Sequence, residues 1–258
     1  MTDRNFDDLA SRFARKIYGG SKGAVRMAVL ERDLKSLGLY ESPPLKMLEA
    51  GGGFGLMAQQ FASLGSQTHV VDISAKMLEH GQSLWKTKRS KGTCHDFGDV
   101  HWHHKAIQET TGQYPLVCCH AVLEWVENPE SVLDHICRRV QSKGVLSLMV
   151  FNEVALVWKN VLYGRIQKVL DERLFGFGQS LTPTHAFTTP QIQCWLEQRG
   201  FEIVTLSGVR IFHDFLPPKV KEELWSDSAS YLELELKYSL DPLYLQMGRY
   251  LHFVCVKK

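Results

Sequence analysis

The chain has 258 residues and a formal net charge of +2, with 44% hydrophobic and 22% charged side chains. This length suits one large domain with additions, and the composition is that of a globular protein rather than a disordered one. No apolar run reaches the roughly 18 residues that span a bilayer, so we expect no membrane segment. The N-terminal stretch MTDRNFDDLASRFARK is charged and lacks the apolar core of a secretory signal.

The N-terminal part predicts helix over residues 6–38. Phe6, Leu9, Phe13 and Ile17 recur at three- and four-residue spacing and can share one apolar face. Residues 19–22 (Gly-Gly-Ser-Lys) interrupt the pattern, a second helical stretch containing Arg26 follows, and Ser-Pro-Pro at 42–44 ends it. We therefore expect residues 1–44 to form an N-terminal helical cap.

Strands and helices then alternate from residue 45 onward. Strands are predicted at 45–50, 68–71, 100–103, 116–119 and 144–151, and helices at 56–64, from Ser74 and at 129–140. Ser74 has the side chain of a helix N-cap. Strands that alternate with helices predict an α/β domain over 45–258, with a doubly wound, mostly parallel sheet.

Residues 152–190 interrupt this alternation. An apolar helical start and a loop rich in glycine and proline predict an insertion that covers the carboxyl end of the sheet as a lid. A helix at 191–199 follows, with Gly200 suited to its C-cap. Two final strands at 201–211 and 250–256 complete a seven-stranded sheet.

The six cysteines bear on metal sites and location. They contain no C-x-x-C pair, which argues against a zinc ribbon or a redox motif, and we expect no metal. Cys118 and Cys119 lie in an apolar run and should be buried. We expect reduced thiols and a cytoplasmic location.

The mild net charge neither requires nor excludes a nucleic-acid partner. Two basic runs fit either a phosphate contact or a solvated helix face; they are Arg12, Arg15, Lys16 and Lys86, Lys88, Arg89, Lys91.

The clearest local signal is a glycine loop that directly follows the first predicted strand. It reads Glu-Ala-Gly-Gly-Gly-Phe-Gly over residues 49–55, and Asp72 ends the next strand, 21 residues after Gly51. Such glycines permit a tight turn and close approach of a ligand, and the acid can accept hydrogen bonds from ribose hydroxyls. A dinucleotide fingerprint would need glycine at position 56, where Leu56 stands. A glycine turn without a ligand is the remaining alternative.

This arrangement resembles the class I S-adenosylmethionine-dependent methyltransferases. The loop at 49–55 and Asp72 look like their first two motifs, and the Ala-Val-Leu-Glu-Trp-Val and Asn-Pro residues over 121–129 look like the loop after their fourth strand. The resemblance covers residues 45–152 and 191–258. It implies S-adenosylmethionine as cofactor and a terminal antiparallel β-hairpin.

A more specific resemblance extends over nearly the whole chain. The blocks at 3–8, 17–19, 22–26, 120–126, 144–149, 208–214 and 248–250 are similar to the bacterial tRNA 5-carboxymethoxyuridine methyltransferase family. That family transfers a methyl group to the carboxylate of a modified wobble uridine in tRNA, which gives a methyl ester. The resemblance implies tRNA as partner, through its anticodon region. It implies cofactor roles for Arg26, Gly51, Gly52, Asp72, Ile107, Gln108 and His120. Two departures stand out: the third predicted strand is unusually polar, and Pro115 replaces a common acidic residue.

The chemistry implied by this resemblance needs few catalytic groups. A carboxylate is already ionised near neutral pH, so we expect no catalytic base or nucleophile. It does need a counter-charge, and Arg210 and Arg249 are the predicted substrate-binding residues, with a structural ion pair as the alternative.

Aromatic side chains could contribute to RNA binding. Trp158, Tyr163 and Phe175 either stack on anticodon bases or form a plain hydrophobic lid. Trp125 is expected in the core. A small-molecule methyltransferase and a non-catalytic cofactor-binding protein remain alternatives, and the sequence does not give the oligomeric state.

Overall fold

A single mixed sheet organises the computed structural model, which describes residues 3–8, 20–91, 97–175 and 183–258. Its strand order is β3-β2-β1-β4-β5-β7-β6, parallel from β3 to β5, with β7 antiparallel to both neighbours. The prediction of a doubly wound, mostly parallel, seven-stranded sheet is confirmed. The strands are β1 (Lys46–Ala50), β2 (Gln67–Asp72), β3 (Val100–His104), β4 (Tyr114–His120), β5 (Val140–Phe151), β6 (Phe201–Val209) and β7 (Tyr250–Lys257).

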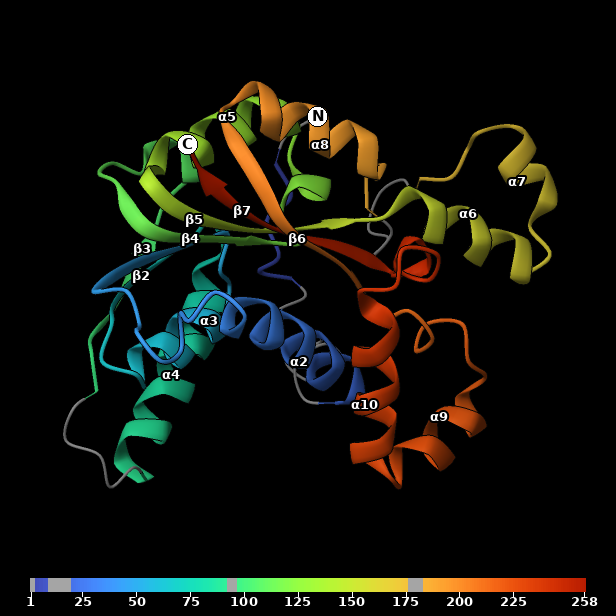
Figure 1. Ribbon diagram of the computed structural model, residues 1–258, viewed down its shortest axis with the longest axis horizontal. Helices are drawn as coiled ribbons and strands as arrows, with labels where there is room; N and C mark the ends of the chain where they lie inside the picture. The colour runs from blue at the N-terminus through green and yellow to red at the C-terminus, as the bar shows by residue number, and fades with distance from the viewer. Residues whose placement is uncertain (1–2, 9–19, 92–96, 176–182) are drawn as a thin grey trace.

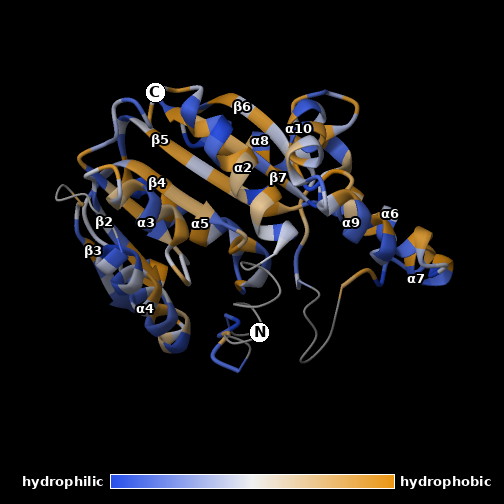
Figure 2. Cartoon of the chain, turned by 90° about the horizontal axis from the view of Figure 1, so that it is seen from below, coloured by the Kyte–Doolittle hydropathy of each residue, from blue (hydrophilic) through white to orange (hydrophobic). Residues whose placement is uncertain are grey.

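Helices cover both faces of the sheet (Figure 1). One face carries α2 (Ser21–Lys35), α3 (Leu56–Ala62), α4 (Ala75–Lys91) and α10 (Ser228–Ser239), and the other carries α5 (Pro129–Arg139) and α8 (Thr189–Gln198). Successive strand residues point to opposite faces, so Met47 packs with Leu30 under α2 while Leu48 packs with Leu133 under α5. Burial on both faces explains the hydrophobic colour over much of β4 and β5 in Figure 2.

Side-chain caps begin several helices where the sequence places them. Asn128 accepts a hydrogen bond from the Ser131 N–H at the start of α5, and Ser74 Oγ accepts one from Met77 N–H at the start of α4. Gly200, with φ +75°, follows α8 as predicted.

The N-terminal prediction is confirmed in part: the second helical stretch, which contains Arg26, is α2, but two details of the prediction are wrong. Residues 3–6 have no regular secondary structure and residues 7–8 form a turn, where the pattern from Phe6 onward predicts helix. Ser21 and Lys22, predicted as part of a break, form the first turn of α2, because Gly20 is extended (φ −140°) and serves as its N-cap. Leu9, Arg12, Phe13, Arg15, Lys16 and Ile17 lie outside the described residues.

Two connections between strands contain helices that the alternation does not account for: one follows β5, and the other joins β6 to β7. After β5 come α6 (Glu153–Leu162) and α7 (Ile166–Leu170), which project from the body in both views (Figures 1 and 2). The chain then returns to the loop after β4, where Thr184 and His185 N–H groups donate to the Glu124 carbonyl. Between β6 and β7 lie α9 (Pro218–Trp225), α10 and the short 3₁₀ helix η4 (Leu245–Met247), none of them predicted. The last two strands pair antiparallel as expected, but a helical excursion joins them instead of a tight turn.

The cysteines outside residues 92–96 are all free, and Cys118 and Cys119 are fully buried, as predicted. Within the described ranges, no helix is long and apolar enough to cross a membrane.

Candidate active site

A cavity of about 390 Å³ opens at the carboxyl ends of β1, β2 and β4. In doubly wound sheets this edge is the usual ligand-binding position, and the volume suits a ligand of nucleoside size. Of the predicted site residues, the cavity wall includes Arg26, Gly51, Asp72, Ile107, Gln108, His120, Arg210 and Arg249. Tertiary folding therefore brings together residues that are spread over most of the chain.

The glycine loop forms one wall because its backbone adopts a conformation that other residues avoid. Gly51, Gly53 and Gly55 have φ of +63°, +54° and +64°. A Cβ on Gly51 would lie only 2.5 Å from Val122 Cγ2. Glycine at position 51 therefore lets the loop pack directly against Val122 after β4, while its backbone lines the cavity.

Gly52 contributes differently. It lines a small side cavity of about 20 Å³, shared with Arg26, Gly51 and His120, and is not part of the main cavity wall. Its N–H already donates to the Val71 carbonyl at 3.1 Å. Its α-carbon packs against Val70 and Glu49, since an added Cβ would lie 2.8 and 3.0 Å from their side chains.

Asp72 is held rigidly at the end of β2. Its Oδ2 accepts from Gly53 N–H and its Oδ1 from Ser74 N–H, each at 2.8 Å. Burial raises the pKa of Asp72, although these two N–H groups oppose the shift. Each oxygen keeps a further lone pair, so the carboxyl group can accept hydrogen bonds from ribose hydroxyls at this end of the cavity.

The N-terminal segment, residues 3–8, lies across the same end. Arg4 N–H donates to the Trp125 carbonyl at 3.0 Å, and the Phe6 ring meets the Trp125 ring edge-on at 5.0 Å. Asp7 Oδ1 accepts from Ser74 Oγ at 2.6 Å, a bond that lowers the pKa of Asp7. The segment thus joins the start of α4 to the loop after β4 and covers the cavity between them.

Ile107 and Gln108 follow β3 in the 3₁₀ helix η2 (Ile107–Glu109). Ile107 is buried and Gln108 is exposed, and both line the cavity with Met77 and Val132. An apolar wall beside an amide side chain suits a flat heteroaromatic ring with polar edges.

His120 ends β4 and faces both cavities. Its Nε2 lies 2.8 Å from Ser147 Oγ, while its Nδ1 has no hydrogen-bond partner among the described residues. Burial lowers the pKa of His120 well below its usual range, so the ring is neutral. Glu49, on the same side cavity, has its pKa raised to about 7 by burial.

The far end of the cavity carries a cluster of cations that we call the cationic pocket: Lys22, Lys159, Arg210 and Arg249. Among the described residues, Asp214 is the one carboxylate at this end of the cavity, with Oδ2 2.9 Å from Arg210 Nε. Burial alone would raise the pKa of Asp214, but Arg210, Arg249 and Lys22 outweigh it and lower the pKa. Burial, then repulsion from Arg249, lowers the pKa of Lys159 to about 8. One carboxylate among four cations leaves a local excess of positive charge, which favours an anionic ligand.

Arg249 is a buried cation of this pocket with an unused hydrogen-bond donor in the described part of the chain. Only 9% of it is exposed, its guanidinium carbon lies 4.3 Å from the Phe151 ring centroid, and its Nη1 has no hydrogen-bond partner in the described part of the chain. Burial lowers the pKa of Arg249. A buried guanidinium nitrogen without a partner is costly, so a ligand oxygen at this position would remove that cost.

Arg210 is held by the unpredicted helix α10. Arg210 has a left-handed backbone (φ +60°), which costs roughly 1–2 kcal/mol in a residue other than glycine. The Glu235 carboxylate on α10 accepts hydrogen bonds from the N–H groups of Ile211, Phe212 and His213, at 2.8, 3.2 and 2.8 Å. These three hydrogen bonds stabilise the turn that places Arg210 and Asp214 at the cavity wall.

Comparison with known proteins agrees with this geometry. A family model described as a methyltransferase domain matches residues 24–206. The tRNA 5-carboxymethoxyuridine methyltransferase of Escherichia coli (strain K12) is 35% identical over 263 residues, covering 100% of this chain and 97% of that protein. The chain belongs to this methyltransferase family. The ubiquinone biosynthesis O-methyltransferase of Glaesserella parasuis is a more distant relative, 24% identical over 63% of this chain and 67% of its own.

Solved structures confirm the class I methyltransferase fold. The magnesium protoporphyrin IX methyltransferase of Synechocystis PCC 6803, with bound SAH, has a TM-score of 0.66 at 15% identity and covers 98% of this chain and 96% of its own. S-adenosylmethionine is the cofactor of the methyltransferase described here. Its cavity fits that molecule, because Asp72 keeps acceptor capacity and His120 Nδ1 is buried with no hydrogen-bond partner among the described residues.

Several cavity residues of the methyltransferase were missed in the sequence. Lys22 and Asp214 lie in blocks that carry the family resemblance, which was a usable signal, whereas Lys159 had none. Trp125 was expected in the core but is half-buried and lines the cavity beside Phe6.

The aromatic residues proposed for RNA stacking differ in their exposure to solvent. Trp158 and Tyr163 are 45% and 63% exposed on and just after α6. Phe175 instead packs against the cluster around Leu156 and Leu174.

Proposed function

We propose that this methyltransferase transfers the methyl group of S-adenosylmethionine to the carboxylate of 5-carboxymethoxyuridine at the wobble position of tRNA, giving a methyl ester. Two findings support the proposal: the full-length relative in Escherichia coli bears that name, and the cavity carries a cationic pocket. The observation that carries the proposal is Arg249, which is buried at the cavity wall with an unpartnered Nη1 in the described structure.

Each of the predicted cofactor residues would contact one part of S-adenosylmethionine. Asp72 would accept hydrogen bonds from the ribose hydroxyls, and Ile107 and Gln108 would contact the adenine. Arg26 would pair with the carboxylate of the methionine group, with Gly51, Gly52 and His120 beside it. When bound, S-adenosylmethionine supplies an electrophilic methyl group on a sulfonium.

Arg210 and Arg249 would hold the substrate carboxylate. A guanidinium can bind a carboxylate through two parallel N–H groups, which fixes its orientation. Arg210 Nε already pairs with Asp214 Oδ2, so Arg249 is the stronger candidate for direct contact with the substrate carboxylate. A single orienting contact leaves electron density on the attacking oxygen, whereas several would reduce its nucleophilicity.

No side chain has to act as base or nucleophile in this proposal. A substrate carboxylate is ionised at neutral pH, and Phe151 and Tyr250, which line the cavity, would exclude water around it. Orientation of two reactants can lower a barrier by on the order of 7–11 kcal/mol. The protein therefore acts by alignment and by matching charge.

The N-terminal part and the 152–190 segment would control access. We propose that residues 1–44 act as a cap, with α2 as its described helix, on the 45–258 catalytic domain, and that 152–190 acts as a lid. Lys159 on α6 reaches the cavity, and Trp158 and Tyr163 next to it are exposed where anticodon bases could stack. A cytoplasmic location is part of the proposal, because it gives access to tRNA.

The test is methyl transfer from labelled S-adenosylmethionine to bulk tRNA that lacks this modification, followed by mild base. Base-labile label is expected, and base-stable label would contradict ester formation. No label in tRNA, with cofactor binding intact, would favour a small-molecule substrate or a non-catalytic role.

Variants of Arg249 sharpen this test. Arg249→Lys keeps the positive charge but loses the two parallel N–H groups of the guanidinium. It should lower kcat/KM for tRNA by roughly 30-fold or more, the loss typical of a buried charged contact. Arg138→Met, at an exposed position on α5 that does not line the cavity, is the matched control and should leave kcat/KM unchanged. Equal effects of the two variants would remove Arg249 from the substrate site.

A further inference from the structure

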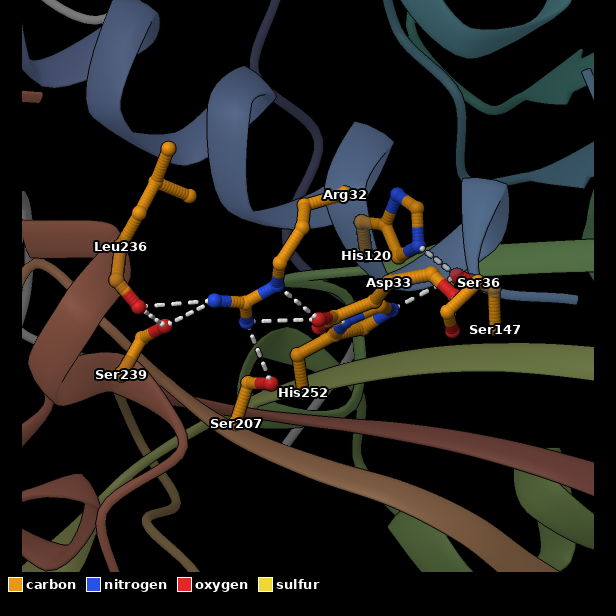
Figure 3. A network of polar contacts seen from close by, with 9 residues as sticks. All are labelled: Arg32, Asp33, Ser36, His120, Ser147, Ser207, Leu236, Ser239 and His252. Atoms are coloured by element: carbon orange, nitrogen blue, oxygen red, sulfur yellow. Dashed lines mark hydrogen bonds and ion pairs between the residues drawn. The ribbon is translucent and has the colours of Figure 1, made fainter. Parts of the chain in front are cut away.

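A chain of buried hydrogen bonds runs from the cofactor cavity to α2 (Figure 3). His120 Nε2 lies 2.8 Å from Ser147 Oγ, and the same oxygen lies 2.8 Å from His252 Nε2. His252 Nδ1 lies 2.7 Å from Asp33 Oδ2. These groups come from β4, β5, β7 and α2 and are 7% exposed or less.

Arg32 fixes the far end of the chain. Its Nε and Nη2 donate to Asp33 Oδ1 at 2.8 and 2.6 Å. Its other N–H groups donate to Leu236 O, Ser239 Oγ and Ser207 Oγ. Burial alone would raise the pKa of Asp33, but His252 and Arg32 outweigh it and lower the pKa, so Asp33 is a carboxylate.

The charges determine the direction of the hydrogen bonds. Arg32 already balances Asp33, so a proton on both nitrogens of the unexposed His252 would leave an uncompensated buried charge. Neutral His252 must donate from Nδ1 to Asp33, because a carboxylate only accepts. His252 Nε2 then accepts from the Ser147 hydroxyl, and Ser147 Oγ accepts from His120 Nε2–H. The His120 ring therefore carries its one proton on Nε2.

This leaves His120 Nδ1 as a bare acceptor. The atom is buried, has no partner in the described ranges, and points away from Ser147 in Figure 3. His120 shares the small side cavity with Arg26 and Gly51. An acceptor next to a guanidinium suits an α-amino acid group, whose carboxylate pairs with the guanidinium and whose ammonium donates to the acceptor.

We propose that Asp33, His252 and Ser147 are positioning residues that hold His120 in the tautomer whose Nδ1 accepts a hydrogen bond from the α-ammonium group of the cofactor. The proposal deepens the cofactor site of the proposed function and does not depend on the methyl acceptor. Asp33 lies 219 positions from His252 in the sequence, so the chain exists only in the folded protein.

Asp33→Asn tests the direction of the chain. The Asn oxygen can keep both Arg32 contacts, while its NH₂ group donates to His252 Nδ1. Each bond then reverses, and His120 turns an Nδ1–H toward the ammonium; the wrong tautomer has the same origin when the aspartate of a serine-protease triad becomes asparagine.

The readout is the dissociation constant of two ligands by calorimetry, S-adenosylhomocysteine and its analogue without the α-amino group. Asp33→Asn should weaken binding of the first by roughly 10- to 100-fold, the range for a hydrogen bond to a charged group, and leave the second within about threefold. The ¹⁵N chemical shifts of His120 should show an unprotonated Nδ1 in the wild type and a protonated one in the variant.

Ser207→Ala is the matched control, because it removes one Arg32 contact without touching the chain. It should leave both dissociation constants unchanged. Equal losses for the two ligands in Asp33→Asn, or an unprotonated Nδ1 in that variant, would overturn the proposal.

If Asp33→Asn does not fold, Ser147→Ala serves instead. It cuts the chain between the two imidazoles and should also weaken binding only of the ligand with an α-amino group. Binding needs no tRNA, so failure of the proposed tRNA reaction leaves this result interpretable.

Discussion

Gly51→Ala should destabilise the protein through two separable effects. Gly51 has φ +63°, a region that L side chains avoid. Its added Cβ would lie 2.5, 3.0 and 3.3 Å from Cγ2, Cγ1 and Cβ of Val122. Because the Val122 Cβ is itself too close, rotation of that side chain does not relieve the contact.

The expected magnitude follows from these two effects. The left-handed backbone costs an alanine about 1–2 kcal/mol, and overpacking costs about 1–3 kcal/mol. Gly51→Ala should therefore lower the free energy of unfolding by about 2–5 kcal/mol. Gly38→Ala separates the two, because Gly38 has φ +70° but no atom of the described structure lies within 4 Å of its added Cβ. It should lose only about 1–2 kcal/mol.

The assay is urea unfolding of Gly51→Ala, Gly38→Ala, Val122→Ala and the Gly51→Ala/Val122→Ala double variant. The double variant should recover about 1–3 kcal/mol relative to the sum of its single changes, since the clash is absent. Calorimetry with S-adenosylhomocysteine should show weaker binding to Gly51→Ala than to Gly38→Ala. Equal destabilisation by the two glycine changes, or strict additivity with Val122→Ala, would refute the reasoning.

Two further predictions concern a buried acid and the N-terminal segment. Burial raises the pKa of Glu124 to about 8, so between pH 4.5 and 8 the folded state binds more protons than the unfolded state and stability falls as pH rises. Between pH 5 and pH 8.5, the free energy of unfolding of Glu124→Gln should therefore rise relative to that of the wild type by on the order of 2–4 kcal/mol. Parallel pH profiles of the two proteins in chemical denaturation would contradict this. Phe6→Ala removes the ring that meets Trp125 over the cavity. It should weaken S-adenosylhomocysteine binding about 5- to 20-fold in calorimetry, whereas unchanged affinity would show that residues 3–8 do not cover the cofactor.

Much of the fold could be predicted because its signals are local. The glycine loop follows a buried strand and Asp72 ends the next one, so adjacent parallel strands place both at one edge of the sheet. The caps at Ser74 and Gly200 depend only on neighbouring backbone groups. The helices between β6 and β7 were missed, and α10 matters to the site because Glu235 fixes the turn that carries Arg210.

The sequence by itself determined the seven strands in chain order, the helices that alternate with the parallel ones, the glycine loop with its acid, and the family. Hydrophobic periodicity and backbone preference act over a few residues, so they can be read along the chain. Only the tertiary structure decided that Lys22, Lys159, Arg210 and Arg249 meet in one pocket, and that Asp33 orients His120 through His252. Electrostatic and hydrogen-bond contacts depend on distance in space, and no local pattern reveals a partner that lies up to 219 residues away.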